Sequence, residues 1–279
     1  MPVLVTSSQR PQARLVVARL LDHGGEVRAY ASGDVGSLRA QGAMVATGEA
    51  DDEGRLEAAL TDVHTVVHLG EGLLTADPAR SIDEVATLVT AATNAQVARI
   101  IALSIAGASL QADDPLRRAY GRIEAMLEQC PVPTIVVRTS VVGHPDVIDA
   151  LVTAGLDADA LSTPVAPVAI EDLVELLAAL DDARSQATSG NLVLAADGPS
   201  IMSLGDYLAG LGALAIVDGR VVADLVGRTL ADTAIVSTLN EAIKGPWTND
   251  DPTVIDAWSL MGLVPVAPEG GAAAGELSW

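Results

Sequence analysis

The sequence predicts an α/β fold in which a doubly wound parallel sheet carries a smaller C-terminal lobe. Short apolar segments typical of strands alternate with amphipathic segments of about 10 to 15 residues typical of helices. The alternation begins at residue 3 and continues to residue 137, and glycines end two of the helical segments. Right-handed crossovers join strands that are separated in this way, so helices cover both faces of a parallel sheet.

The opening unit consists of a strand, a tight turn and an amphipathic helix. The strand is expected at residues 3–6 and the turn at 7–13. The helix that follows places leucine and valine side chains on one face and stops at Gly24. Dinucleotide-binding βαβ units open in this way, although this turn contains no glycine.

The alternation continues through five more strands and four more helices. Further strands are expected at 26–31, 43–47, 65–69, 99–103 and 133–137, and helices at 33–42, 53–60, 82–95 and 120–129. The first domain therefore spans 1–143. Beyond it the pattern loosens into a C-terminal lobe, 144–266, which we expect to be interleaved with the sheet and to be followed by a flexible tail, 267–279.

Elements of the lobe are less regularly spaced. Helices are expected at 146–154, at 170–180 and from residue 204, with a strand at 191–195. These segments form a substrate lobe packed beside the sheet.

Composition excludes several classes of function. The formal charge of −21 argues against nucleic acid and anionic membranes as partners, because both select for clustered basic residues. No apolar segment approaches the roughly 20 residues of a membrane-spanning helix, and no secretory signal is expected. The single cysteine, Cys130, cannot form an internal disulfide, which indicates a reducing, cytoplasmic setting. Of the sixteen basic residues only Lys244 is a lysine, so any chemistry that needs a lysine depends on it.

The order and spacing of these segments resemble those of a known family. The matching positions are 3–6, Gly24, 66–69, 170–173 and a glutamate, Glu124, that precedes Arg138 by fourteen positions. In these features the chain resembles the atypical and extended short-chain dehydrogenase/reductases, which include NAD-dependent epimerase/dehydratase-like and NmrA-like proteins. The resemblance implies a Rossmann-like fold, with a dinucleotide site at the first turn.

The first turn departs from the family pattern. The family's three glycines permit a tight turn and close approach of the pyrophosphate, but here their positions hold Ser7, Arg10 and Ala13. Pro11 suits the first position of the helix yet removes one backbone donor. Two interpretations of Arg10 stay open: its guanidinium pairs with a phosphate, or it fills the vacated groove.

Other positions of the family's cofactor site are equally altered. Ser32 stands where NADP-using relatives carry an arginine, and only Asp34, in the following loop, is acidic. His68 ends the fourth strand, where open α/β sheets bind ligands. We therefore expect no cofactor or weak NAD(P) binding, with Ser7, Arg10, Ser32 and His68 at the positions of the family site.

The catalytic residues implied by the resemblance are incomplete. The family's oxidoreductases use a tyrosine whose pKa is lowered by a lysine four residues later. If Tyr120 is that tyrosine, Glu124 occupies the lysine position, where a carboxylate raises the pKa of a phenol. If the spacing to Arg138 sets the register, Leu116 occupies the tyrosine position. In neither register is the dyad present.

Three residues remain candidates for catalysis: Ser104 at the end of the fifth strand, Tyr120, and His144 at the expected mouth of the cleft. No metal site is expected, because His64 and His68 share a strand face without a third ligand at a recognisable spacing.

Three functions remain open. The first is a degenerate family member that binds a small molecule in the cleft between the lobes, with or without non-redox chemistry such as cyclisation, dehydration or isomerisation. The second is an NAD(P)-dependent reductase or epimerase with altered phosphate contacts. The third is a non-catalytic NmrA-like sensor. The expected partners are a small-molecule ligand and, as an open alternative, a second copy of the chain.

Overall fold

A computed structural model describes most of the chain. The described residues are 2–8, 10–33, 35–154, 157–183, 190–217, 220–223, 232–243 and 245–267. Asp34, Lys244 and all of the predicted tail except Ala267 lie outside them.

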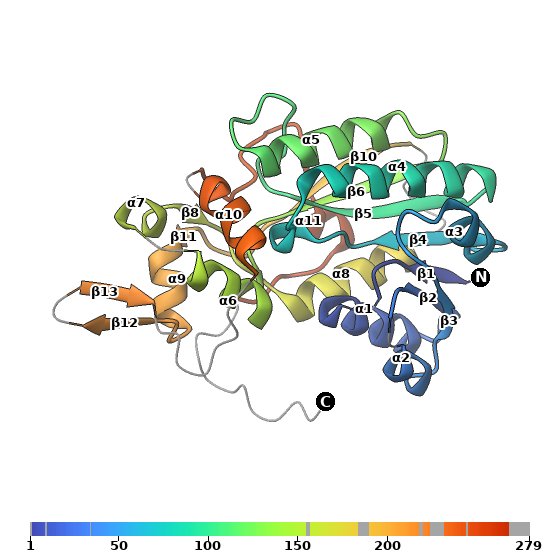
Figure 1. Cartoon of the computed structure of the whole chain (residues 1–279), viewed down its shortest axis with the longest axis horizontal. Coiled ribbons are helices and arrows are strands. Elements are labelled where there is room, and N and C mark those ends of the chain that lie inside the picture. The colour runs from blue at the N-terminus through green and yellow to red at the C-terminus, as the bar shows by residue number, and fades with distance from the viewer. Residues whose placement is uncertain are drawn as a thin grey trace.

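The centre of the fold is an eight-stranded sheet whose neighbouring strands all run parallel (Figure 1). Its order is β14-β10-β6-β5-β4-β1-β2-β3. The strands are β1 (Val3–Val5), β2 (Val27–Ala31), β3 (Met44–Thr47), β4 (Thr65–His68), β5 (Arg99–Ile105), β6 (Thr134–Thr139), β10 (Leu192–Ala196) and β14 (Ile255–Asp256). The predicted fold class, a Rossmann-like doubly wound sheet, is confirmed. The strand order reverses between β1 and β4, and such a switch point is where ligands of these sheets bind.

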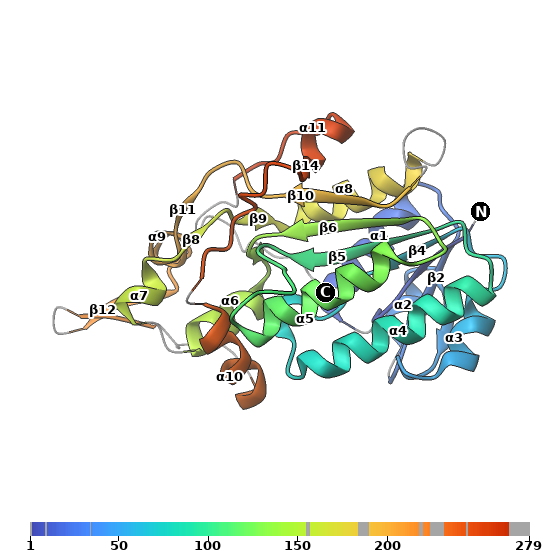
Figure 2. The same cartoon turned by 90° about the horizontal axis from the view of Figure 1, so that it is seen from above.

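Helices cover both faces of the sheet (Figure 2). One face carries α3 (Glu53–Leu60), α4 (Pro78–Asn94) and α5 (Pro115–Glu128), and the other carries α1 (Pro11–Asp22), α2 (Gly36–Ala40), α8 (Ile170–Asp182) and α11 (Ala257–Met261). Strand β1 shows how the pleat separates the two cores. Leu4 packs with the first set, whereas Val3 and Val5 pack with the second.

Two helices begin earlier than the periodicity of apolar residues predicts. Helix α4 begins at Pro78 and α5 at Pro115, whereas the sequence patterns indicate residues 82 and 120. In both helices an aspartate caps the first turn and a proline occupies the first helical position. Asp77 accepts from the backbone of residues 79 and 80, and Asp114 from that of residue 117. The Asp-Pro pair is a start signal that an apolar pattern does not contain.

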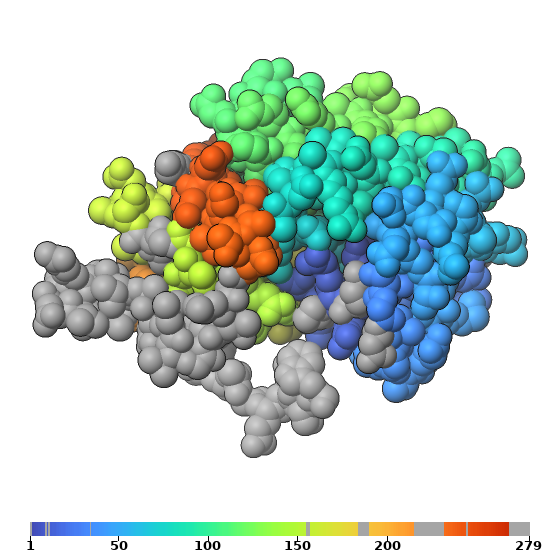
Figure 3. All heavy atoms as spheres, viewed as in Figure 1, coloured from blue at the N-terminus to red at the C-terminus, as the bar shows by residue number. Residues whose placement is uncertain are grey.

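The C-terminal part returns to the main sheet through β10 and β14. A short 3-10 helix, η1 (Gly72–Leu74), follows β4. The remaining elements of the C-terminal part are β7 (Val142–Gly143), α6 (Pro145–Thr153), α7 (Ala158–Leu161), β8 (Pro164–Val165), β9 (Val168–Ala169), β11 (Met202–Ser203), α9 (Leu204–Gly210), β12 (Leu214–Val217), β13 (Arg220–Ala223) and α10 (Thr233–Ala242). Figure 3 shows α10, in orange, between α5 and α6, and it contacts both. The sequence patterns did not predict α10.

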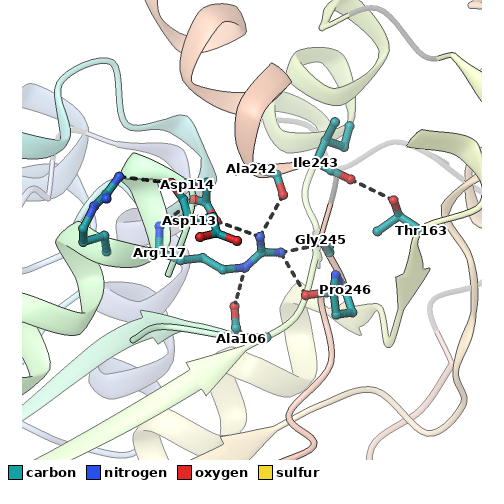
Figure 4. A network of polar contacts seen from close by, with 10 residues as sticks. Ala106, Asp113, Asp114, Arg117, Thr163, Ala242, Ile243, Gly245 and Pro246 are labelled. Atoms are coloured by element: carbon teal, nitrogen blue, oxygen red, sulfur yellow. Dashed lines mark hydrogen bonds and ion pairs between the residues drawn. The ribbon is translucent and has the colours of Figure 1, made fainter. Parts of the chain in front are cut away.

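Arg117 of α5 ties the segment after α10 to the sheet (Figure 4). Its guanidinium donates to the carbonyl oxygens of Ala106, Ala242, Gly245 and Pro246, at 2.8 to 3.3 Å. It also pairs with Asp114 at 2.9 Å. Its carbon Cζ lies 4.3 Å from the centre of the Trp247 ring, within the range of a cation–π contact. Only 6% of Arg117 is exposed, so these contacts are made away from water.

Candidate functional site

Two cavities lie at the carboxyl ends of the parallel strands. The first cavity lies over β4, β5 and β6, between α1 and α8. It is lined by Gln12, Val16, Leu69, Gly70, Glu71, Gly72, Leu73, Leu103, Ser104, Ile105, Tyr120, Thr139, Ser140, Val142, Val147, Ile170, Leu173, Val174 and Leu177. Most of these side chains are aliphatic, so the first cavity suits an apolar ligand.

The second cavity lies over β1, β2 and β3. It is lined by Thr6, Ser7, Arg10, Tyr30, Ala31, Ser32, Gly48, Glu49, Ala50, Leu56, His68, Glu71, Arg80, Glu84 and Leu88. Glu71 lines both cavities, so the two meet at the loop that follows β4. The structure thus brings Ser104 and Tyr120 together in the first cavity, and Ser7, Arg10, Ser32 and His68 together in the second.

The turn after β1 keeps a tight shape without glycine. Ser7 has a φ of 52°, a left-handed conformation that is uncommon for any residue except glycine. Its neighbour Ser8 stabilises the turn, because its hydroxyl donates to the carbonyl of Val5 at 2.6 Å and its N–H donates to the carbonyl of Tyr30. Ser8 is fully buried, and its two hydrogen bonds therefore stabilise the conformation of a turn that contains no glycine.

Arg10 is the residue that precedes α1, and its side chain crosses the junction of the two cavities. Its guanidinium pairs with the carboxylate of Glu71, sixty-one positions away. Both side chains are partly buried, at 29% and 26% exposed. The side chain of Arg10, the N-cap residue of α1, makes no capping hydrogen bond, and the first turn of the helix contains no acidic residue. The junction therefore keeps two features that bind anions, a helix N-terminus and an arginine.

His68 lies at the floor of the second cavity. Its Nδ1 lies 2.9 Å from Oγ1 of Thr6, on the neighbouring strand. Burial lowers the pKa of His68 to about 4, so the imidazole is neutral near pH 7. It can offer a hydrogen bond but no positive charge to a ligand.

The low pKa of His68 makes stability depend on pH. Because the native pKa is about 4 and the ordinary value is 6.5, the unfolded chain binds the proton first as the pH falls. We expect the free energy of unfolding to decrease between pH 6.5 and 4, by roughly 3 kcal/mol in total, and to be insensitive to His68 below that range. Chemical denaturation at several pH values measures this, with His68→Gln as the comparison. An equal slope in both proteins would contradict the expectation.

Tyr120 lines the first cavity, but its hydroxyl is already engaged. The hydroxyl accepts a hydrogen bond of 2.7 Å from the N–H of Gly72. Burial raises the pKa of Tyr120 above its ordinary value of 10. The tyrosine of a Tyr/Lys dyad needs a lowered pKa, so this phenol is poorly suited to that role. Leu116, at the tyrosine position of the alternative register, is fully buried in the core.

Ser104 is likewise part of an internal network. Its hydroxyl donates to Oε1 of Glu124 at 2.6 Å. Arg138 donates to both carboxylate oxygens of the same glutamate, at 2.9 and 2.6 Å. The carboxylate of Glu124 is therefore ion-paired with Arg138 and hydrogen-bonded to Ser104. The main cause of the raised pKa of Tyr120 is burial, and Glu124 is not among the causes. The spacing of Glu124 and Arg138 is visible in the sequence, but no sequence pattern indicates that Ser104 is hydrogen-bonded to Glu124.

His144 occupies a different place from the other candidates. It is buried, and its Nδ1 accepts from the backbone of Asp146 at the start of α6. Burial lowers the pKa of this histidine as well. Its ring acts as the cap of α6.

Among the described residues, no three histidine, cysteine, aspartate or glutamate side chains lie close enough together to bind a metal ion. In the same part of the chain, no helix combines the length and apolar character that a bilayer-spanning segment requires.

The linings show which residues are placed to hold a dinucleotide. In the second cavity, Tyr30, Leu56 and Leu88 are apolar wall residues, and Ser32 follows the end of β2. The first cavity is lined mainly by aliphatic side chains. At the junction, the guanidinium of Arg10 can pair with a phosphate, but here it is paired with the carboxylate of Glu71.

Comparison with known proteins places this geometry among nucleotide-binding folds. Residues 10–138 match the model of a family described as NAD(P)H-binding. The match begins at Arg10, so Ser7 lies outside it. A comparison with curated protein sequences gave no significant match.

Several solved structures share the fold over nearly the whole chain. The triphenylmethane reductase of Citrobacter sp., complexed with NADP(H), has a TM-score of 0.71 at 17% identity, covering 96% of this chain and 97% of that one. The NADPH-dependent quinone oxidoreductase of Escherichia coli, complexed with NADPH, has a TM-score of 0.70 at 19% identity, covering 95% and 96%. A nucleoside-diphosphate-sugar epimerase of Staphylococcus aureus has a TM-score of 0.71 at 15% identity, covering 96% and 98%. At these identities the likeness shows the fold alone.

Proposed function

We propose that the protein is a reductase that binds NAD(P)H across the two cavities, because residues 10–138 match the model of a family described as NAD(P)H-binding. Its second substrate is a flat, apolar, conjugated molecule in the first cavity. NAD(P)H, when bound, supplies a hydride to that molecule. The protein supplies a water-poor apolar site and an orientation, and no side chain of a Tyr/Lys dyad.

The observation that carries this proposal is that neither hydroxyl of the first cavity is activated as a proton donor. Ser104 already donates its proton to Glu124, and burial raises the pKa of Tyr120, so its phenol is a weaker acid than usual. A simple ketone requires a proton donor at its oxygen as the hydride arrives. A quinone or a cationic dye accepts hydride without one, because its conjugated system stabilises the added charge. Its oxygens can take protons later, from solvent.

The names of two structural neighbours agree with this substrate class. One is a reductase of triphenylmethane dyes and the other an oxidoreductase of quinones. Both kinds of molecule are conjugated and largely apolar, as the lining of the first cavity requires.

A second candidate function is favoured by the pair of Arg10 and Glu71, which occupies the phosphate path. In that case the first cavity binds a small molecule without a dinucleotide, with or without non-redox chemistry. The sensor function, binding without turnover, is the third arm of the same test.

Two measurements distinguish the three candidate functions. The first is calorimetric titration with NADPH and NADH, and the second is an assay of NAD(P)H oxidation with quinones and triphenylmethane dyes. Binding with turnover supports the reductase, binding without turnover supports the sensor, and no binding supports the dinucleotide-independent function.

A conservative variant tests the proposed chemistry directly. We expect Tyr120→Phe to lower kcat by less than about tenfold, because the phenol does not donate the proton. An acid–base tyrosine is worth about 100-fold or more. A loss of that size in kcat, with unchanged NADPH affinity and melting temperature, would refute the proposed mechanism.

A further inference from the structure

We propose that Glu71 is an internal competitor of the dinucleotide phosphates, and that Arg10 exchanges the Glu71 carboxylate for a phosphate when the dinucleotide binds. The inference rests on the proposed function. It assigns residues 10 and 71 as the pair that sets affinity for the cofactor.

Arg10 and Glu71 lie where the two cavities meet. Glu71 is common to both cavities, and Arg10 lines the second at the point where α1 begins. A ligand that extends from one cavity to the other must pass this junction. The Arg10–Glu71 ion pair lies at this junction.

The junction also has groups that attract an anion. The side chain of the N-cap residue Arg10 makes no capping hydrogen bond, and the first turn of α1 contains no acidic residue, so the positive end of the helix dipole favours an anion there. Arg10 adds a guanidinium that pairs equally well with a carboxylate or a phosphate. Glu71 supplies from within the chain the negative charge that a bound phosphate would otherwise supply.

The backbone of the loop that carries Glu71 is held by hydrogen bonds. Gly70 and Gly72 both have positive φ, at 57° and 55°. The N–H of Gly72 is bonded to the hydroxyl of Tyr120, and its carbonyl accepts from Oγ1 of Thr75. Because the backbone on the C-terminal side of Glu71 is fixed in this way, the carboxylate can leave Arg10 by side-chain rotation while the loop stays.

The second cavity contains another ion pair besides that of Arg10 and Glu71. Glu84 lines the same cavity and is paired with Arg80 at 3.0 Å. Both arginines that line this cavity are therefore ion-paired, and only Arg10 is paired with the carboxylate that lines both cavities. A dinucleotide must displace Glu71 from Arg10, so the measured affinity is lower than that of an open site.

Titration of four variants with NADPH tests the proposal. Glu71→Gln removes the competing charge, Arg10→Gln removes the guanidinium, and the double variant removes both. Glu84→Gln is the matched control, because it neutralises another carboxylate of the second cavity that pairs with Arg80 instead of Arg10. Thermal unfolding of each variant verifies that it is folded.

We expect E71Q to bind NADPH about tenfold more tightly than the wild type, the size of one charge-assisted hydrogen bond. The double variant should lie within about twofold of R10Q, because the gain requires the guanidinium. E84Q should gain markedly less than E71Q.

Two results would overturn the exchange. Equal affinity of the wild type and E71Q would remove Glu71 as a competitor and leave the proposed function standing. An equal gain from E71Q with and without Arg10 would show simple repulsion in place of exchange. If neither the wild type nor E71Q binds NADPH or NADH, the proposed function fails and this inference with it.

Discussion

Replacing Arg117 by methionine is expected to lower the free energy of unfolding by about 3 to 5 kcal/mol. Methionine keeps much of the side-chain volume but leaves Asp114 as a poorly solvated charge, with 11% of its side chain exposed. The carbonyl oxygens of Ala106, Ala242, Gly245 and Pro246 lose their donor at the same time (Figure 4). Denaturant titration measures the loss.

Arg118 provides the matched control. It is the next residue of the same helix, and its guanidinium donates to the carbonyl of Asp113 at 3.1 Å. We expect Arg118→Met to change stability by no more than about 0.5 kcal/mol. Similar losses from the two substitutions would show that the network around Arg117 contributes little.

Adding a methyl group at Gly121 is expected to lower the free energy of unfolding by about 2 kcal/mol or more. Gly121 lies within α5, where alanine is otherwise the more favourable residue. An ideal Cβ there would lie 2.2 Å from the carbonyl carbon of Ser109 and 2.5 Å from the nitrogen of Leu110. Both are backbone atoms, so the loop after β5 must move away from α5.

Gly54 is the corresponding control in α3. The nearest atom to an ideal Cβ at that position is Oδ1 of Asp52, at 4.0 Å. We expect Gly54→Ala to be neutral or to stabilise the protein by up to about 0.5 kcal/mol. The sign of the effect should therefore differ between the two helical glycines, and thermal and chemical unfolding of both variants measures it. Stabilisation by Gly121→Ala would contradict the close contact.

Three polar residues of the cleft are linked through the loop that follows β4. Tyr120 holds the loop at Gly72, and that loop carries Glu71, which engages Arg10. Substitutions at these three positions are thus expected to be coupled. A single altered motif, considered alone, gives no indication of this dependence.

The sequence by itself determined the order of the main strands and helices and indicated the edge of the sheet at which open α/β folds generally bind their ligands. Both follow from local patterns, because a strand buried on both faces is continuously apolar and a surface helix repeats every 3.6 residues. Candidate residues could also be assigned to positions, since Ser32 and His68 each end a strand and parallel strands end at one edge.

Only the tertiary structure decided what those residues contact. Arg10 and Glu71 are sixty-one positions apart, and the acceptors of Arg117 lie more than a hundred residues beyond it, except Ala106 and Asp114. Periodicity fixes which face of an element a side chain occupies, whereas its partner depends on how distant elements pack and where a long side chain can reach. For this reason the sequence left the role of Arg10 open, and the packed structure shows it paired with Glu71 across the junction of the two cavities.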